Sequence, residues 1–386
     1  MVVDKVKVSI IKTPPRPVRG QIRRAVTRAI ELCGGLPPVI KPGVTVLLKP
    51  NLVDVPKSRE SGAITHPEVC RAVAELVREA GASPMIADSA GIGTDTEEVI
   101  KFMGYQELRE AGFPVKDLKK DKELIVRNPG ARVLPRLKVY ETALKVDAII
   151  NLPVLKTHDQ TEITLGLKNL KGLLADHSKK RMHRRGVFEG VPELTSFFNP
   201  CLTVLDGIYC QEGVGPVFGD PVEMDLIAAS TDPLALDIIG GLIIGYRPEE
   251  VPITRSAIRL GLGAGRLSEI EVVGASLESV RRRFKRCSET EILGRELPCR
   301  LRMAEETCTG CRNTVAAVLV EMSELGLLSS LEGITIVTGC PEIRPEDPPR
   351  RVIVGRCARP LRSQGIYVDG CPPENSWLIE ALLTGF

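Results

Sequence analysis

Three segments decide the fold of this chain: VTVLLK at residues 44–49, PEVCRAVAELVREA at residues 67–80 and MIAD at residues 85–88. The first and third are short apolar runs of the kind that form buried strands. In the second, apolar residues recur at the spacing of an amphipathic helix, at Val69, Val73, Leu76 and Val77. Strands that alternate with helices in this way predict a mostly parallel sheet covered by helices.

The same alternation continues through the first 290 residues. We expect further strands at residues 7–11, 148–152 and 202–206. Residues 232–245 begin with Asp-Pro, a favourable start for a helix, and continue as an apolar helix. The predicted fold class is therefore α/β, with residues 1–290 forming one domain around a mostly parallel sheet. Open sheets of this kind bind ligands at the carboxyl ends of their strands.

A smaller unit is expected at residues 300–386. The basic run RRRFKR at residues 281–286 is expected to end a helix, and a polar stretch follows it. Beyond this boundary we predict, in chain order, a helix near residues 313–325, strands at residues 334–337 and 352–354, and a last helix after Pro373. So short a segment buries little core, and a bound metal would stabilise it. The prediction is a small C-terminal α+β domain that binds metal.

Composition narrows the classes of function. The 386 residues are 43% hydrophobic and 26% charged, with a net charge of only +3, which favours neither a nucleic-acid partner nor a membrane surface. The basic residues also lack the interleaved aromatic residues of many nucleic-acid-binding surfaces. No apolar run reaches the roughly 18 residues of a spanning helix, and no secretory signal is visible. Eleven cysteines without such a signal favour a reducing, cytoplasmic setting, where clustered thiols bind metal.

Polar side chains follow four of the predicted strands directly or closely. They are Lys49, Asn51, Asp88, Lys156, His158 and Asp206. Each could belong to an ordinary turn, because Asp and Asn are common turn residues. Four polar strand ends on one edge of a sheet would instead meet in a single cleft. We therefore expect a ligand site there.

Residues 156–185 are rich in basic side chains and contain three of the four histidines. A flexible cationic loop over a cleft would attract phosphate or carboxylate groups and close on them. The alternative for residues 179–185 is a solvated basic loop. Histidine transfers protons near neutral pH. The candidates for general acid–base steps are His66, Asp88, His158 and His183.

The motif KNLKG at residues 168–172 differs from a surface charge run. It follows TLGL at residues 164–167, which has the pattern of a half-buried segment. Lys168 and Lys171 are therefore expected to point toward a polar cleft, with Asn169 between them. Buried lysines need an anionic partner or ligand.

A second glycine-rich segment, GVGP at residues 213–216, follows Glu212. It lacks the Lys-Ser/Thr ending of a nucleotide P-loop and does not match GxGxxG. A turn between two strands is the favoured interpretation of this segment. Glu212 itself is a further candidate for ligand binding.

The last eighty residues contain five cysteines, at Cys308, Cys311, Cys340, Cys357 and Cys371. A CxxC pair directs two thiolates at one metal, and two later cysteines complete a tetrahedral site. The spacing matches neither the bacterial ferredoxin run nor the paired CxxC of a zinc ribbon. Free buried thiols are the alternative. Four other cysteines lie in apolar surroundings and are expected in the core, namely Cys33, Cys70, Cys201 and Cys210.

Taken together, these motifs resemble a family catalogued as domain of unknown function three-six-two. The resemblance covers about residues 5–250 and rests on KPN at 49–51, THPE at 65–68, DS at 88–89, KTH at 156–158, KNLKG at 168–172, DG at 206–207, EGVGP at 212–216, Asp232 and Asp237. Members often carry an iron–sulfur segment, commonly of ferredoxin type. This chain departs from that pattern, because its C-terminal CxxC, Gly-x-Cys and Gly-Cys-Pro-Pro are similar to those of a subgroup. The resemblance implies a cluster, of the [4Fe–4S] type, on Cys308, Cys311, Cys357 and Cys371, with Cys340 as a neighbour.

Three functions compete on this basis. The first is a redox or cluster-dependent enzyme, an oxidoreductase or a lyase or hydrolase, that acts on an anionic small molecule bearing phosphate or carboxylate. The ligand-binding residues would be Lys49, Asn51, Lys156, Lys168, Asn169, Lys171, Asp206 and Glu212. The second is an electron carrier or cluster-delivery protein that works with a redox partner. The third is a zinc-stabilised binding module, since four thiolates also suit zinc. A homodimer is left open.

Overall fold

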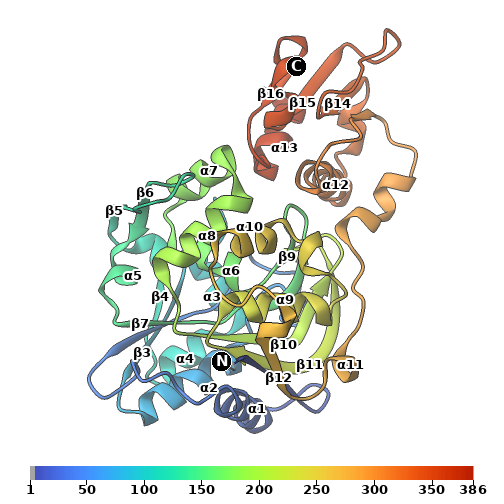
Figure 1. Ribbon diagram of the computed structural model, residues 1–386. Helices are drawn as coiled ribbons and strands as arrows, with labels where there is room; N and C mark the ends of the chain where they lie inside the picture. The colour runs from blue at the N-terminus through green and yellow to red at the C-terminus, as the bar shows by residue number, and fades with distance from the viewer. Residues whose placement is uncertain (1–4, 386) are drawn as a thin grey trace.

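Two parallel or mostly parallel sheets organise residues 5–385, the part of the chain that this computed structural model describes (Figure 1). The strands of the large sheet are β1 (Val6–Lys12), β2 (Thr45–Lys49), β3 (Ser83–Asp88), β4 (Val115–Asp117), β7 (Ala148–Asn151), β8 (Val154–His158), β9 (Glu162–Thr164), β10 (Leu202–Glu212), β11 (Asp220–Ser230) and β12 (Ile270–Gly274). Their order is β12-β1-β11-β10-β7-β2-β3-β4, and β8 pairs with both β10 and β9. A separate hairpin joins β5 (Glu123–Arg127) to β6 (Arg136–Tyr140).

Helices cover both faces of the large sheet. They are α1 (Arg19–Leu32), α2 (Pro67–Glu79), α3 (Thr96–Met103), α4 (Gln106–Glu110), α5 (Glu141–Lys145), α6 (Gly166–Asn169), α7 (Asp176–Arg185), α8 (Val187–Phe198), α9 (Pro233–Ile243), α10 (Pro252–Leu260) and α11 (Leu277–Val280). Neighbouring residues of β2 enter different cores: Val46 and Leu48 pack with α1 and α2, whereas Leu47 packs with α8 and α9. Because side chains alternate across a strand, this division shows a sheet buried on both sides.

The β2–α2–β3 segment has the predicted arrangement. β2 and β3 pair in parallel, with Thr45 opposite Ser83 and Leu48 opposite Ile86. α2 begins after His66, whose ring accepts a hydrogen bond from the Glu68 N–H and so caps the helix. The predicted α/β class is confirmed.

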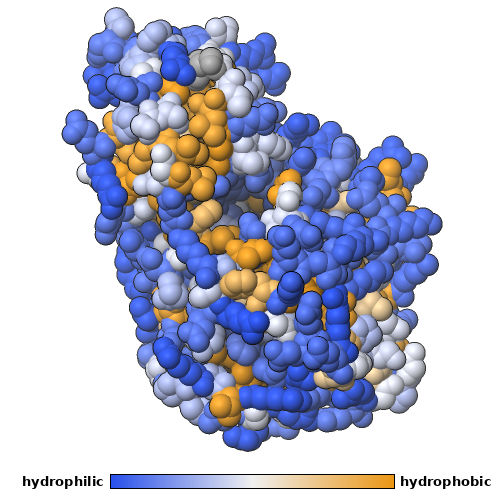
Figure 2. Space-filling model, turned by 180° about the vertical axis from the view of Figure 1, so that it is seen from behind, coloured by the Kyte–Doolittle hydropathy of each residue, from blue (hydrophilic) through white to orange (hydrophobic). Residues whose placement is uncertain are grey.

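The smaller unit lies at the C-terminal end of the chain, at the top of Figure 1. Its sheet contains β13 (Arg300–Met303), β14 (Ile334–Thr338), β15 (Arg350–Val354) and β16 (Ile366–Val368), and every pairing is parallel. Its helices are α12 (Thr309–Glu324) and α13 (Asn375–Thr384). Its core includes Leu319 and Leu378 from the helices and Ile336 and Val352 from the strands. Figure 2 shows hydrophobic side chains gathered on one face of this unit, above a larger unit whose surface is mainly hydrophilic.

One expected helix end is wrong. The helix before the basic run ends at Val280, and residues 281–286 have no helical structure. The reason is long-range pairing, because the N–H groups of Arg282 and Phe284 donate to the carbonyls of Ile243 and Ile244 at the end of α9. The fully buried ring of Phe284 then anchors this segment to the core of the large unit.

GVGP at residues 213–216 lies in the turn between β10 and β11, as predicted. Within residues 5–385, no helix is both long enough and apolar enough to cross a bilayer.

Candidate functional site

The ends of β2 and β3 meet in a buried ion pair. Lys49 Nζ lies 2.7 Å from Asp88 Oδ1, and the two side chains are only 1% and 3% exposed. Lys49 also donates to the carbonyl of Pro50 at 2.6 Å, and Asp88 Oδ2 accepts from the N–H of Leu52 at 2.8 Å. The neighbouring Gly172 leaves them room, since a Cβ there would lie 1.9 Å from Asp88 Oδ1. Both charges are thus balanced inside the chain.

Buried amide side chains link this pair to the next strand. Asn169 Oδ1 accepts from Lys49 Nζ at 3.3 Å and from Asn51 Nδ2 at 2.9 Å. Asn51 Oδ1 in turn accepts from Lys156 Nζ at 3.0 Å. The Lys156 ammonium also donates to the carbonyls of Ala63 and Pro216. The N–H groups of Lys49 and Lys156 are therefore already used in hydrogen bonds within the chain.

The basic segment expected as a flexible or solvated loop is in part a helix, α7, so that expectation is corrected. Asp176 in its first turn and the basic residues in its last turn complement the helix dipole. Lys179 and His183, four residues apart, lie on its buried face, whereas Lys180 and Arg184 are exposed. Lys179 Nζ donates to Ser89 Oγ at 2.8 Å, to the Ala90 carbonyl at 2.7 Å and to Asp176 Oδ1 at 3.1 Å.

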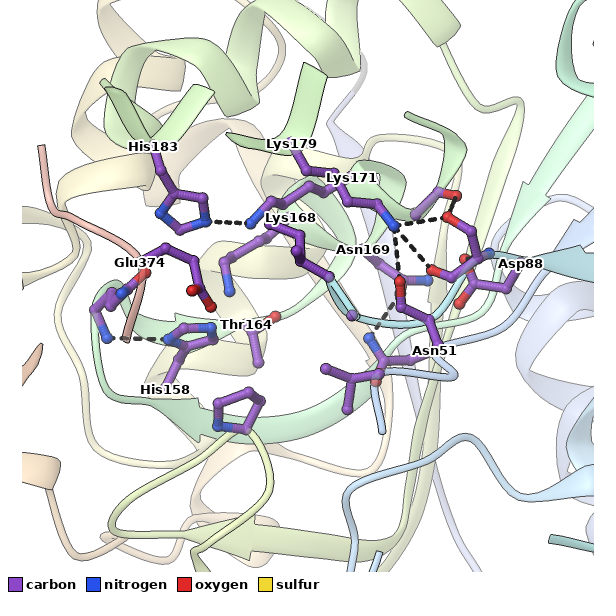
Figure 3. A pocket seen from close by; sticks show the side chains of 18 of the residues that line it. Asn51, Asp88, His158, Thr164, Lys168, Asn169, Lys171, Lys179, His183 and Glu374 are labelled. Atoms are coloured by element: carbon purple, nitrogen blue, oxygen red, sulfur yellow. Dashed lines mark hydrogen bonds between the residues drawn. The ribbon is translucent and has the colours of Figure 1, made fainter. Parts of the chain in front are cut away.

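These elements enclose a cavity of about 180 Å³ (Figure 3). The residues predicted from the sequence that line it are Lys49, Asn51, Asp88, His158, Lys168, Asn169, Lys171 and His183. Lys179, Asp159 and Gln160 also line it, together with Glu374 and Asn375 from the smaller unit. The volume lies below the usual range for drug-sized ligands and suits a small metabolite.

Two lysines of the cavity retain unused N–H groups. The side chain of Lys168 makes no hydrogen bond or ion pair with any residue between 5 and 385, and it reaches the middle of the cavity in Figure 3. Lys171 Nζ lies 2.5 Å from His183 Nε2, which is its one hydrogen-bond partner in the same range of residues. An incoming ligand would meet these two side chains, because the other cavity lysines are already saturated.

His183 connects Lys171 to the smaller unit. Burial lowers the pKa of His183 well below its usual value, so the ring is neutral. Its Nε2 accepts from the Lys171 ammonium, which places the ring proton on Nδ1, 3.3 Å from the carbonyl of Pro372. The neutral ring thus bridges a cavity lysine and the Gly-Cys-Pro-Pro segment.

His158 forms a second polar pair with Asp159. The His158 Nδ1 contacts Asp159 Oδ1, and Gln160 N–H donates to the same oxygen at 2.7 Å. Asn375 Nδ2 holds the other carboxylate oxygen at 2.7 Å. The Gln160 N–H also lies 3.0 Å from Nδ1. Nε2 has no hydrogen-bond partner among residues 5–385, so it is the ring nitrogen available to exchange a proton with a ligand. Burial lowers the pKa of His158 to about 4, which keeps the ring neutral at pH 7.

Burial dominates the electrostatics of the cavity lysines. It lowers the pKa of Lys171 and of Lys179 to about 8, and that of Lys156 to about 7. The pKa of Lys168 falls well below its usual value, first because of burial and then because Lys171 is near. An anion in the cavity would oppose all of these shifts.

Four residues predicted for the site lie outside the cavity lining: His66, Lys156, Asp206 and Glu212. Asp206 accepts the backbone N–H of His66 at 2.7 Å, so both shape the start of α2. Glu212 accepts the N–H of Lys285 at 2.9 Å and holds the segment that leads to the smaller unit. Lys156 positions Asn51 by donating a hydrogen bond to its Oδ1.

The sequence analysis did not single out the polar lining residues Asp159, Gln160, Glu374 and Asn375. Asp159 follows His158 directly, and this adjacency could have identified it. Glu374 and Asn375 carry no such signal, because they come from the far end of the chain.

The cysteine segment packs against the large unit close to this cavity. A Cβ on Gly310, inside the CxxC turn, would lie 3.0 Å from Phe188 Cζ and 3.3 Å from Pro372 Cγ. The N–H of Cys371 donates to the His183 carbonyl at 2.7 Å, and its carbonyl accepts from Val187 N–H at 3.0 Å. The Gly-Cys-Pro-Pro segment is thereby attached to the end of α7 and the start of α8.

The C-terminal thiols form a candidate donor set for a metal centre. A hydrogen bond from the Cys311 thiol lowers the pKa of Cys308 to about 6, and the charges of Cys357 and Cys371 act on Cys311. Cys340 is exposed and donates to the carbonyl of Cys357 at 3.2 Å. No three His, Cys, Asp or Glu side chains of the described chain lie close enough together to hold a metal ion. The quartet fits a four-thiolate centre in its chemistry, and binding would draw the thiols together.

Comparison with known proteins gives the following similarities. The family described as Domain of unknown function (DUF362) matches residues 46–241, which leaves the C-terminal cysteines outside the match. A curated thylakoid-associated protein of Synechocystis sp. is 35% identical over 250 residues, covering 63% of this chain and 76% of that protein. The solved structure of the lactate racemase apoprotein from Thermoanaerobacterium thermosaccharolyticum has a TM-score of 0.38 and 13% identity, over 87% of this chain and 69% of that chain.

Proposed function

The chain belongs to the family described as Domain of unknown function (DUF362), and on that premise we propose that it is an iron–sulfur enzyme acting on a small anion. The anion, a carboxylate or phosphate, binds in the cavity on Lys168 and Lys171. The cluster is held by Cys308, Cys311, Cys357 and Cys371.

The unused N–H groups of Lys168 and Lys171 are the observation that carries this proposal. Two amine groups in a partly open cavity lose part of their hydration, and the described chain supplies no hydrogen bond to the Lys168 side chain in its place. An anionic group offsets that cost and takes up the free donors. Of the carboxylates on the cavity wall, Asp88 is paired with Lys49 and Asp159 with His158. The third, Glu374, accepts the N–H of Ser376 at the start of α13, and its charge acts on Lys171.

The four thiols support the second part of the proposal. Cys308, Cys311, Cys357 and Cys371 interact through their charges, whereas the Cys340 thiol donates to a backbone carbonyl. A cluster on this quartet would supply an electron, or a Lewis-acidic iron if one iron lacked a protein ligand. The Cys371–His183 contact supports a position of this cluster near the bound anion.

Within the cavity, different residues have different roles. Lys171 holds the anion and is itself positioned by the neutral ring of His183. His158, oriented by Asp159, exchanges a proton with the bound molecule through Nε2. The saturated Lys49 and Lys156 keep the cavity wall in shape rather than binding the ligand.

Anaerobic purification tests both parts. Iron, sulfide and zinc analysis with a visible spectrum is expected to show a cluster that Cys357→Ala and Cys371→Ala abolish. Calorimetric titration with acetate and with inorganic phosphate is expected to show binding that Lys171→Met weakens at least about tenfold, with Lys180→Met as the exposed control. Colourless protein with stoichiometric zinc would support the zinc-stabilised module instead. A cluster in a protein that binds neither anion would support the electron carrier.

A reducing, cytoplasmic compartment remains part of the proposal. All eleven cysteines are free thiols, as such a compartment maintains them. The similar protein of Synechocystis sp. is thylakoid-associated by name, which is the competing location. Cell fractionation with an antibody to this chain distinguishes the two.

A further inference from the structure

We propose that Lys168 is an amine nucleophile, which forms an imine with the carbonyl carbon of a short oxo acid whose carboxylate lies against Lys171. This inference rests on the proposed anion site and adds to it a substrate class and a covalent step. It assigns different tasks to two lysines that the sequence presents as equivalent.

The two side chains share one face of a short helical stretch. Lys168 lies in α6 and Lys171 in the 3-10 turn that follows it, Leu170–Leu173. Residues three apart on a helix project to the same side, so both ammonium groups reach the same cavity. A molecule with a carbonyl close to its carboxylate can therefore contact both lysines at once.

Hydrogen bonding separates the roles of the cavity lysines. Lys49 donates to three acceptors within the chain and Lys179 to four, and a nucleophile cannot act while its nitrogen is held in this way. Lys171 is held by His183. Over residues 5–385, Lys168 alone among the lysines lining the cavity has no hydrogen bond or ion pair. Its nitrogen is free to approach a carbonyl carbon.

The surroundings of Lys168 favour the neutral amine. Its charge is opposed by burial and by the neighbouring ammonium groups of Lys171 and Lys156, which together lower its pKa well below the usual value. A desolvated lysine beside another cation is a recognised way to activate an amine. Lys171 has a pKa of about 8 and keeps its charge at pH 7 for the carboxylate.

The covalent step balances without an oxidant or reductant. The Lys168 lone pair forms a C–N bond to the carbonyl carbon, while the C=O π electrons move to oxygen, which gains a proton as the nitrogen loses one. The resulting carbinolamine then breaks its C–O bond, the departing oxygen takes up the remaining N–H proton and leaves as water, and the neutral imine is formed. His158 is the proton carrier for both transfers, since it is neutral and close enough for its pKa to feel the Lys168 charge.

Reductive trapping tests this role. The full-length, anaerobically purified protein is incubated with glyoxylate and sodium cyanoborohydride, and the adducts are mapped on peptides by mass spectrometry. Lys168 is expected to be modified at least about tenfold faster than the exposed Lys180, because its amine is neutral and the carboxylate is held nearby. Acetate should compete for Lys168 and leave the Lys180 reaction unchanged.

Two variants complete the test. Lys168→Arg has no amine nucleophile, and it is expected to lose the cavity adduct. Lys180→Arg is the matched surface control and should retain the adduct at Lys168. Circular dichroism checks that both variants are folded.

The outcomes separate this inference from the function on which it rests. If wild-type protein binds acetate and glyoxylate but labels only exposed lysines, the imine role is overturned and the anion site stands. If neither anion binds, both proposals fail. An adduct at Lys168 that acetate does not slow would also overturn the inference, since the carboxylate would not be held in the cavity.

Discussion

The backbone N–H of Cys371 donates a hydrogen bond of 2.7 Å to the carbonyl of His183. Cys371 is a proposed cluster ligand, and the His183 ring holds Lys171 in the cavity. The next residue, Pro372, places its carbonyl 3.3 Å from His183 Nδ1. The proposed metal centre and the proposed anion site are therefore joined through one histidine.

Removal of the metal is expected to weaken anion binding. Without a cluster, Cys371 and Pro372 lose an anchor. The hydrogen bond between His183 Nδ1 and the Pro372 carbonyl is then weakened. The loss of one hydrogen bond is worth about 1 kcal/mol, so acetate affinity should fall about fivefold after chelation. Calorimetry on loaded and chelated protein measures this. Cys340→Ala, which alters an exposed thiol outside the proposed quartet, should keep both iron and affinity. Equal affinities in the loaded and chelated protein would show that the two sites are uncoupled.

Gly172→Ala is expected to break the Lys49–Asp88 pair. The new Cβ would lie 1.9 Å from Asp88 Oδ1 and 2.8 Å from Lys49 Nζ, and a shift of either group would break its buried hydrogen bonds to Leu52 N–H and the Pro50 carbonyl. Separation of a buried ion pair costs about 3 kcal/mol or more in the free energy of unfolding, which urea denaturation measures. Gly294→Ala is the control, because a Cβ there meets nothing within 4 Å. A change below about 1 kcal/mol in Gly172→Ala would contradict the described geometry.

Anion affinity should fall as the pH rises above about 8. The pKa of Lys171 is lowered to about 8 by burial, so its ammonium is charged below that pH and neutral above it. Acetate, which stays ionised throughout, therefore loses its cationic partner, and affinity should decrease by up to tenfold per pH unit between pH 8 and 9.5. Calorimetry across this range gives the slope. Lys171→Arg should flatten the curve, because arginine stays protonated. Affinity that increases with pH would rule out Lys171 as the anion's partner.

Gly355→Ala is expected to reduce cluster loading. A Cβ at this position would lie 2.6 Å from Cys311 Sγ, so the thiol would be pushed out of the proposed quartet. Iron content and visible absorbance per chain should fall by half or more. Gly333→Ala is a matched control, since that glycine has a similar positive φ, 72° against 88°, with nothing within 4 Å of a Cβ. Equal iron in the two variants would exclude Cys311 as a ligand.

The strands and long helices of this protein could be predicted from local pattern. The apolar run of β2 and the 3.6-residue spacing of α2 appear in the structure within a residue or two of their predicted bounds. Such patterns depend on neighbours a few residues apart, so a single sequence carries them. The polar residues that end β2 and β3 were also predictable, because parallel strands bring their carboxyl ends together.

Tertiary contacts decided which of the predicted residues face the cavity. The sequence presents Lys49, Lys156, Lys168 and Lys171 as equivalent cations, and only the structure shows that the first two are saturated. Their partners are distant: Asn169 lies 120 residues from Lys49, and Asn51 lies 105 residues from Lys156. Likewise, α7 exists as a buried helix because its inner face packs under Ser89 and beside Pro372.

The sequence by itself determined the α/β class, the polar edge of the sheet and the set of thiols that could bind metal. The tertiary structure decided which lysine of the cavity is unpaired within residues 5–385, namely Lys168. It also decided that the cysteine segment contacts the cavity through His183. The physical reason is that periodicity is a local property of the chain. Whether a buried charge is satisfied depends instead on groups that folding brings together from remote segments.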